Sequence, residues 1–378
     1  MAQRPGPAGF GLSPRCGAVL AAALLTGRAA AWDVLGPNAT PTGAKVDAAA
    51  RFAVIRGETS PWASPQVVTD PAALVSVASA TLAYLRAMKA TDPAAGPGMF
   101  AELGVTQDRM EATLERVIAT ATDHPERLSD PEWIRSSFDL YTWSPDPEEP
   151  RVQQWKLQPG EIRVTRYLTT QTEGATAADA THTQALYADP GEPWRSTYTR
   201  AQVMAGAFQA GPATGAARPL VWLTEDAVHD AIMQGSTAVR HPDGSTHIYG
   251  VDVSNGVPYV ASHSRRTQDR YWYFRERPNG PNGWGPPGSP EIALKAGVSV
   301  AGDVYNLGLG RLILLEYPEG AGTTLRLAVL ADSGGAFQPN LCQLDFYGGA
   351  FPSHDALYAA WKSLPGHVRA SVLVAHLP

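Results

Sequence analysis

Apolar residues recur at helical spacing in the first third of the chain. Asp70 is a suitable N-cap, Pro71 suits the first position of a helix, and the apolar positions that follow repeat every three or four residues. The same spacing recurs twice more before residue 140. The pattern predicts three helices, over 71–89, over 106–121 and from 130 onward. Residues 32–68 have weak periodicity and much proline, alanine and glycine, so we expect an irregular lead-in there.

The pattern changes after residue 160. Residues 161–172 (EIRVTRYLTTQT) are rich in β-branched and aromatic types and predict a strand. Asp243-Gly244 and Asn255-Gly256 are two-residue turn signals between strand-like runs. Further strands are predicted over 236–241, 247–253, 257–262, 270–275, 298–303, 311–317, 324–331 and 341–347. The second part of the chain is therefore expected to be mainly β and barrel-like.

Two short helices and one linker interrupt this β-rich part or precede it. Thr199 and Gln202 form a capping box that opens one helix, and Thr224 caps another that stops before Gly235. Residues 145–151 (PDPEEPR) are acidic and proline-rich, and we expect them to be a linker.

Length and charge narrow the class of protein. At 378 residues the chain predicts two or three domains, and 44% hydrophobic residues are enough to build their cores. The net charge is −6 and there is no cluster of lysine and arginine, which argues against a nucleic-acid partner.

The N-terminus has the pattern of a secretory signal peptide over residues 1–31. Arg4 and Arg15 supply a positive region, residues 16–26 (CGAVLAAALLT) are apolar, and three alanines precede Trp32. Eleven apolar residues are too few to span a bilayer, so we expect an exported protein without stable membrane insertion. Cys16 lies before the apolar run rather than after it, which is the wrong order for a lipoprotein. A cytosolic protein with a disordered leader is the alternative.

Two apolar runs near the end of the chain each contain an aspartate. Asp332 ends the first run and is followed by Gly334 and Gly335, which favour a tight turn. Asp345 lies within the second run, on the same face of a strand as Gln343 and Tyr347. From periodicity alone, a solvated strand face is the simpler interpretation of Asp345.

The sequence argues against a serine protease, an internal disulfide, and a metal or phosphate-binding site. The segment Asp332-Ser333-Gly334-Gly335 matches a local signature of trypsin-like proteases, but no suitable histidine segment precedes it, so Ser333 is interpreted as a turn residue. After leader cleavage only Cys342 remains, so no internal disulfide is expected. No histidine or cysteine pair has zinc-site spacing and no phosphate-binding loop is present, so we expect neither a metal nor a cofactor.

Nine short segments occur in a characteristic order between residues 165 and 349. They are TRYLT (165–169), YTRA (198–201), LVWL (220–223), MQGS (233–236), NGVPY (255–259), YFRE (273–276), SVAGD (299–303), DSGGA (332–336) and DFYGG (345–349). This ordered set resembles the MltA family of lytic murein transglycosylases with its C-terminal 3D domain. Two departures lie between the aspartates: Gln338 stands where the family pattern has lysine, and two extra residues separate Asp332 from Asp345.

The resemblance implies a mainly β fold, a double-psi β-barrel with an inserted second β-domain after a helical N-terminal segment. The implied division is a leader over 1–31, a helical segment over 32–160, a barrel domain over 161–172 and 260–378, and an inserted domain over 173–259. It further implies a monomeric, periplasmic or cell-envelope lyase that acts on peptidoglycan glycan strands and leaves 1,6-anhydromuramyl ends.

The family's catalytic aspartate falls on Asp345, and a supporting aspartate falls on Asp332. The implied substrate-binding residues are Gln234, Gly235, Ser236, Tyr167, Thr169 and Tyr347. A single acid suffices if the sugar's own C6 hydroxyl is the nucleophile, because a tethered nucleophile replaces the second carboxylate of ordinary glycosidases. Such an acid needs a pKa raised by burial or by a nearby negative charge, which Asp332 is placed to supply. Two alternatives stay open: an expansin-like protein that binds wall polysaccharide without cleaving it, and a hydrolase that uses both aspartates.

Overall fold

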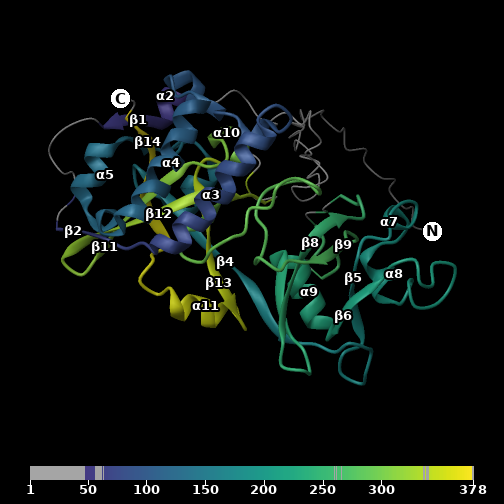
Figure 1. The fold of residues 1–378 in the computed structure, drawn as a ribbon. Helices are drawn as coiled ribbons and strands as arrows, with labels where there is room; N and C mark the ends of the chain where they lie inside the picture. The colour runs from purple at the N-terminus through teal and green to yellow at the C-terminus, as the bar shows by residue number, and fades with distance from the viewer. Residues whose placement is uncertain are drawn as a thin grey trace, which may run out of the picture.

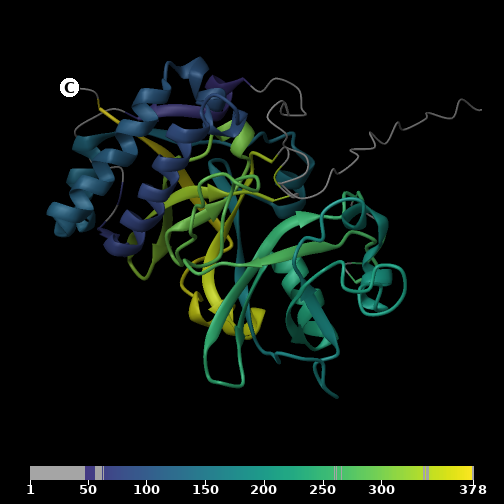
Figure 2. The same cartoon turned by 45° about the vertical axis from the view of Figure 1, so that its right-hand side comes forward.

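The computed structural model describes residues 47–55, 62, 64–258, 260, 262–264, 266–334, 337 and 340–376. The leader predicted over 1–31 lies outside the described residues. The described chain forms two lobes that lie side by side (Figures 1 and 2). The larger lobe holds both ends of the described chain and the long helices, and the smaller lobe is formed by its middle. Each lobe has its own hydrophobic core.

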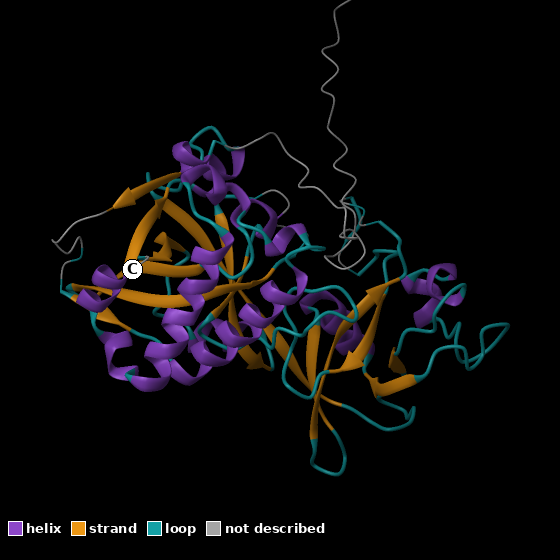
Figure 3. Cartoon of the chain, turned by 45° about the horizontal axis from the view of Figure 1, so that its top comes forward, coloured by secondary structure: helices purple, strands orange, loops and turns teal. Residues whose placement is uncertain are grey.

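Helices cover one side of the strands in the larger lobe (Figure 3). The three predicted helices are confirmed as α3 (Pro71–Met88), α4 (Gln107–Asp123) and α5 (Pro131–Ser137). Asp70 caps α3 as predicted, accepting a hydrogen bond from the Ala73 N–H at 3.0 Å. The shorter helices of this lobe are α2 (Ala48–Arg51), η1 (Pro93–Ala95), η2 (Gly98–Leu103), η3 (Pro125–Ser129), α6 (Pro150–Trp155), α10 (Val304–Leu307) and α11 (His354–Ala360).

By length and composition α3 is apolar enough to cross a membrane. In the fold it packs against α4 and against strand β12 (Gly322–Asp332), and Leu74, Val77 and Leu85 on its inner face are fully buried. α3 therefore has the position of a core helix.

The strands of the larger lobe close into a ring of six. The ring consists, in order of pairing, of β14 (His367–Ala375), β11 (Leu312–Glu319), β12, β10 (Ser299–Ala301), β13 (Gln343–Phe351) and β4 (Glu161–Glu173). β4 also pairs with β14, which completes the ring. Three more strands pair outside it: β1 (Phe52–Ile55), β2 (Pro65–Val67) and β3 (Phe138–Trp143). The mainly β class is confirmed, while the double-psi connection remains a prediction.

The smaller lobe continues the same sheet. β7 (Ser236–Arg240), β8 (Thr246–Ser254) and β9 (Trp272–Glu276) follow β4 in order of pairing, and the Asp243-Gly244 turn joins the first two of them as predicted. β5 (Gln184–Tyr187) and β6 (Pro219–Leu223) form a second sheet. The helices of this lobe are α7 (Trp194–Thr197), α8 (Arg200–Met204) and α9 (Glu225–Gln234). The capping box of α8 and the Thr224 cap of α9 are both confirmed.

One prediction about the first half of the chain is wrong, and a second is correct over only part of its range. The region expected to be an irregular lead-in contains α2, β1 and β2, and β1 is held by antiparallel pairing with β3, which lies some ninety residues further along. The linker expected over 145–151 ends in α6, which begins at Pro150. Long-range pairing of this kind has no local signal in sequence periodicity.

The strand predicted over 257–262 is also wrong. The described residues after Asn255-Gly256 run irregularly, and β8 finds its next partner in β9 instead. The side chain of Gln268, which is 4% exposed, bonds both to the Val260 N–H at 2.9 Å and to the Val260 carbonyl at 2.8 Å. The Gln268 side chain thus makes the hydrogen bonds to Val260 that a neighbouring strand would have made.

One long strand belongs to both lobes. β4 has 13 residues, pairs with β13 and β14 over its first part, and pairs with β7 over its last four residues. The lobes are therefore joined by a continuous hydrogen-bonded strand, and the side chains along β4 lie where the lobes meet.

A buried carboxylate connects the helical layer to the segment between β9 and β10. Asp92 is 7% exposed and accepts hydrogen bonds from the Tyr84 hydroxyl and the Trp284 indole N–H, both at 2.6 Å. Asp92→Ala is expected to lower the free energy of unfolding by about 2–4 kcal/mol, because two buried donors lose their shared acceptor. Urea unfolding checks this. Asp123→Ala, at an exposed position on α4, is the control and is expected to change stability by less than about 0.5 kcal/mol; equal effects would contradict the prediction.

Candidate active site

The face of β4 that carries Thr165, Tyr167 and Thr169 forms the floor of the candidate site. These residues alternate with inward-facing ones, as the period of a strand requires. The parallel register places Thr165 opposite Asp345 and Tyr167 opposite Tyr347 on β13. The sequence separation between these partners is about 180 residues, so only the closure of the barrel brings them together.

The two aspartates flank the short strand β10. Ala301 on β10 is level with Asp345 on the antiparallel β13 and also with Asp332 on the parallel β12. Since neighbouring strands lie about 4.8 Å apart, the two aspartate backbones are separated by about 10 Å across β10. Their side chains share an environment in which the charge of Asp345 acts on Asp332.

Asp332 is held at the end of β12 by two donors. The Tyr167 hydroxyl donates to its Oδ2 at 2.9 Å, and the Ser333 backbone N–H donates to its Oδ1 at 2.8 Å. Burial raises the pKa of Asp332 to about 7, these two hydrogen bonds lower it, and the charge of Asp345 raises it. Burial, and then the charges of Asp332 and Asp345, raise the pKa of the Tyr167 hydroxyl well above its ordinary value. Tyr167 therefore keeps its proton and donates the hydrogen bond.

Asp345 is half-buried, and one of its oxygens is enclosed. Its Oδ1 is buried and has no hydrogen-bond partner among the described residues. Burial raises the pKa of Asp345 to about 6, opposed by the Thr165 hydroxyl and by the positive charge of Arg166. The direction agrees with the sequence-based expectation, and the main cause is burial rather than the charge of Asp332.

A chain of hydroxyl groups continues from the aspartates toward the smaller lobe. The Thr169 hydroxyl lies 2.9 Å from both the Tyr347 hydroxyl and the Ser236 hydroxyl, which begins β7. The Tyr167 and Tyr347 rings pack with centroids 5.2 Å apart. Polar groups from the two lobes thus form one continuous row along β4.

Gln234 and Gly235 end α9 beside this row. The Leu168 N–H of β4 donates to Gln234 Oε1 at 3.4 Å. Gly235 terminates the helix with a φ of 79°, a left-handed conformation that favours glycine, and it directs the chain into Ser236. All eight residues that the sequence singled out therefore lie along one strip of the structure. Their roles remain a prediction.

Sequence reasoning missed three contributors to the strip. His354 on α11 lies with its Nε2 3.2 Å from Gln234 Nε2, which connects the lobes a second time. Thr165 sits beside Asp345 and accepts from the Gln343 amide at 2.8 Å. The buried Asp303 accepts from the Asn340 N–H at 3.0 Å and so fixes the end of the segment between the aspartates. The signal for Asp303 was its place in the SVAGD segment, whereas His354 lies on a helix that periodicity did not indicate.

Metal ligands are not grouped in the described part of the chain. No cluster of three or more histidine, cysteine, aspartate or glutamate side chains among those residues is placed to hold a metal ion. The chemistry available at the strip is that of two carboxyl groups with raised pKa values and a row of hydroxyl and amide groups.

Tyr167→Phe is expected to raise the pKa of Asp332 further, by about one unit, because the hydroxyl bond favours the ionised carboxylate. Carboxyl-carbon NMR of labelled aspartate measures this. Tyr198→Phe, in the smaller lobe, is the control and is expected to leave Asp332 unchanged. An unchanged or lowered Asp332 pKa in the Tyr167 variant would show that the bond does not act on the ionised form.

The two aspartates predict a pH dependence of stability. Their pKa values rise on folding from 3.8 to about 6 and about 7, so between pH 4 and pH 7 the folded state holds more protons than the unfolded state. Stability contributed by these groups therefore falls as the pH rises through this window. The Asp345→Asn variant is expected to have a higher free energy of unfolding than the wild type at pH 7. This difference is expected to be smaller at pH 4. Urea unfolding across this range tests it, with Asp123→Asn as control; a constant difference between wild type and Asp345→Asn would refute the assignment.

Comparison with known proteins supports the fold. No protein-family model and no curated protein sequence matches the chain. Solved structures do match it: Escherichia coli MltA with bound chitohexaose aligns at 15% identity and a TM-score of 0.57 over 86% of this chain and 95% of that one.

Two further structures agree. A membrane-bound lytic murein transglycosylase from Agrobacterium tumefaciens aligns at 16% identity and a TM-score of 0.52, covering 81% of this chain and 93% of its own. MltA from Neisseria gonorrhoeae aligns at 14% identity and a TM-score of 0.51, covering 79% and 87%. Across most of its length the chain is thus similar in fold to the lytic transglycosylase MltA, as its ordered segments predicted.

Proposed function

We propose that this protein is an exported peptidoglycan lytic transglycosylase. It cleaves the β-1,4 bond between N-acetylmuramic acid and N-acetylglucosamine without adding water and leaves a 1,6-anhydromuramyl end. The observation that carries the proposal is the pair of enclosed aspartates on either side of β10, at the junction of two lobes whose fold is similar to that of MltA.

Asp345 is the proposed acid and base. With a pKa of about 6 it keeps a protonated fraction of about one tenth at pH 7, and a general acid works best when its pKa lies near the operating pH. Its buried Oδ1 has no partner among the described residues, and this is the oxygen proposed to meet the substrate. The protonated group donates to the glycosidic oxygen as the bond breaks.

The nucleophile is the C6 hydroxyl of the same muramyl residue. It attacks the anomeric carbon, and the ionised Asp345 takes its proton, which returns the aspartate to its starting state. Because the hydroxyl is tethered beside the carbon it attacks, effective molarity replaces the second catalytic carboxylate. No water enters the product, so no water-activating base is needed.

Asp332 is the proposed electrostatic partner. The pKa of Asp332, about 7, lies above that of Asp345, about 6, so about half of Asp332 is ionised at pH 7, and this ionised fraction favours the proton on Asp345. Tyr167 and the Ser333 N–H fix the position of Asp332 and stabilise its charge. The ionised form of Asp332 also stabilises the positive charge that develops on the sugar ring during bond cleavage.

The strip along β4 is the proposed glycan path. E. coli MltA was crystallised with bound chitohexaose, and we propose that a glycan strand lies here in the same way. The hydroxyl groups of Thr169, Ser236 and Tyr347 and the amide of Gln234 supply donors and acceptors for sugar hydroxyl and N-acetyl groups. Tyr167 contributes beside the bond that breaks, and the backbone at Gly235 leaves room for close approach.

The remaining expectations complete the proposal. The residues after a cleaved leader over 1–31 form a helical segment, a barrel and an inserted domain. The barrel is taken to be of the double-psi type, and the inserted domain extends through β9, because β8 and β9 pair within the smaller core. The protein acts as a monomer in the periplasm or cell envelope.

A second candidate is hydrolysis. Both aspartates have raised pKa values and both line the same strip. An ordinary glycosidase likewise uses two carboxyl groups beside the bond that it hydrolyses. In that reaction water replaces the C6 hydroxyl, and the products have reducing ends.

Product analysis of purified peptidoglycan digested by the mature protein tests the proposal. Mass spectrometry is expected to show anhydromuramyl ends, and Asp345→Asn is expected to reduce product release by about 10²–10⁴-fold, because general acid catalysis contributes that factor. Asp332→Asn is expected to lose less.

Ser333→Ala is the matched control. Its side chain bonds to the Gly302 carbonyl at 2.8 Å, while its contact with Asp332 is made by the backbone, so activity is expected to be retained within a few-fold. Reducing ends would favour hydrolysis, binding without release would favour a non-catalytic wall-binding protein, and full activity of Asp345→Asn would refute the site.

A further inference from the structure

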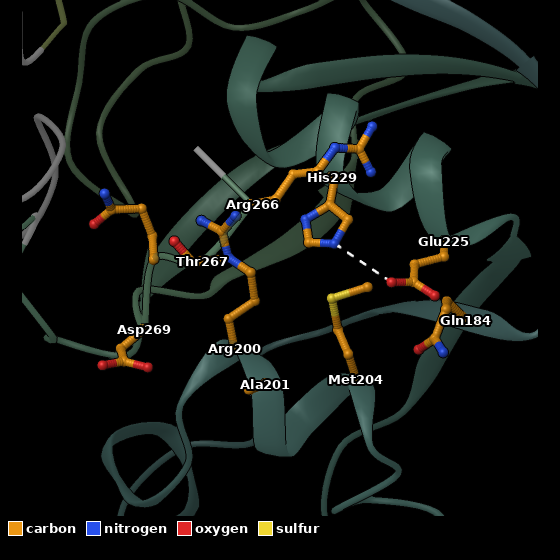
Figure 4. Close-up of a pocket in the computed structure, with 10 residues that line it drawn as sticks. Gln184, Arg200, Ala201, Met204, Glu225, His229, Arg266, Thr267 and Asp269 are labelled. Atoms are coloured by element: carbon orange, nitrogen blue, oxygen red, sulfur yellow. Dashed lines mark ion pairs between the residues drawn. The ribbon is translucent and has the colours of Figure 1, made fainter. Parts of the chain in front are cut away.

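A second polar pocket lies within the smaller lobe, apart from the aspartate strip. It has a volume of about 320 Å³ and is formed by α8, α9, β5 and the segment 266–269 that precedes β9 (Figure 4). Of these elements only α9 reaches the strip, through Gln234 at its end. The mechanism proposed above uses none of the side chains that line this pocket.

One side of the pocket is positively charged. Arg200 opens α8, is 6% exposed and donates from Nε to the Arg270 carbonyl at 2.7 Å. That bond anchors the side chain, whose guanidinium points from α8 toward His229 on α9 (Figure 4). Burial lowers the pKa of Arg200, and the charge of Asp269, which also lines the pocket, opposes this.

His229 carries an unsatisfied buried atom on the same side. The residue is 9% exposed, and its Nδ1 is buried without a hydrogen-bond partner among the residues that the structure describes. Burial first, and then the charges of Arg200 and Arg266, lower the pKa of His229. Arg266 is exposed and already paired with Asp226 at 2.5 Å, so an anion at His229 would be stabilised mainly by Arg200.

The other side of the pocket is negatively charged. Glu225, one turn before His229 on α9, lies with Oε1 3.8 Å from His229 Nε2. Its side chain is 67% exposed, so it faces the pocket opening. The charges of Arg200 and Arg266 and the charge of Glu225 therefore act on the same imidazole ring in opposite directions.

We propose that this pocket binds the head group of an amino acid, with its carboxylate between Arg200 and His229 and its ammonium group toward Glu225. Arginine pairs with carboxylates through charge-assisted hydrogen bonds, and the ligand gives His229 Nδ1 a partner, which it does not have among the described residues. A volume of about 320 Å³ lies at the small end of ligand sites and suits one amino acid residue.

Two sources can supply this head group, and one of them rests on the function proposed above. Peptidoglycan stem peptides that contain diaminopimelate carry a free carboxylate and a free ammonium group on one carbon. His229 precedes Gln234 by five residues, which is about 7.5 Å along α9, and three extended peptide residues span about 10 Å. A stem peptide attached to a glycan on the strip is therefore long enough to approach the pocket. The other source is a free amino acid.

Calorimetry with D-alanine, D-alaninamide and N-acetyl-D-alanine tests the pocket. D-alanine is expected to bind, and the two derivatives, each lacking one charge, are expected to bind at least about tenfold more weakly. His229→Gln and Glu225→Gln are expected to weaken D-alanine binding by about tenfold, whereas Glu132→Gln, at an exposed position on α5, is not. NMR of the wild-type protein should show the His229 ring pKa rising when D-alanine binds, as a neighbouring carboxylate requires.

The source is identified by comparing a diaminopimelate-containing muropeptide with the same glycan stripped of peptide, both added to Asp345→Asn so that neither is cleaved. Binding of the muropeptide that depends on His229 identifies the stem peptide, and binding of D-alanine alone identifies a free amino acid. No D-alanine binding, or binding that neither pocket variant weakens, overturns the proposal whatever the outcome at Asp345.

Discussion

The closure of the barrel through β4 is the constraint on which the rest of the structure depends. β4 must pair with β13 and β14 to close the ring, and its last residues must pair with β7 to carry the smaller lobe. This double pairing fixes the register opposite Asp345 and places Ser236 beside Thr169. The strip is thus a consequence of backbone hydrogen bonds, and its side chains are positioned by regular strands rather than by flexible loops.

The same closure explains why two carboxyl groups have raised pKa values. Strands on both sides of β10 remove water from Asp332 and Asp345, and few donors replace it at Asp345. Such groups destabilise the ionised fold near neutral pH, which is a usual consequence of building an acid into a protein interior. The large apolar core around the barrel, with Leu312, Leu344 and Phe346 fully buried, supplies the stability that offsets it.

Sequence patterns predicted much of this arrangement, for physical reasons that differ between elements. Caps such as Asp70 and Thr199 are local signals and were confirmed, and β12 and β13 followed from their apolar runs. β1 was not predicted because it is held by pairing with the distant strand β3. The strand predicted after Asn255 does not form, and the Gln268 side chain bonds to Val260 there instead. The meeting of Asp345 with Thr165 depends on parallel pairing across some 180 residues, which periodicity does not encode; only the ordered family segments indicated it.

The regular spacing along β4 has an evolutionary consequence. Alternate residues of a strand are about 6.7 Å apart. Backbone geometry therefore sets the spacing of Thr165, Tyr167 and Thr169. The segment from Ser333 to Asn340 is anchored separately, through Gly302 and Asp303. A change in the length of the chain between Asp332 and Asp345 can therefore leave the spacing of these three side chains unaltered. Under the proposed function, the spacing of the sugar contacts along β4 and the length of this segment are therefore independent features.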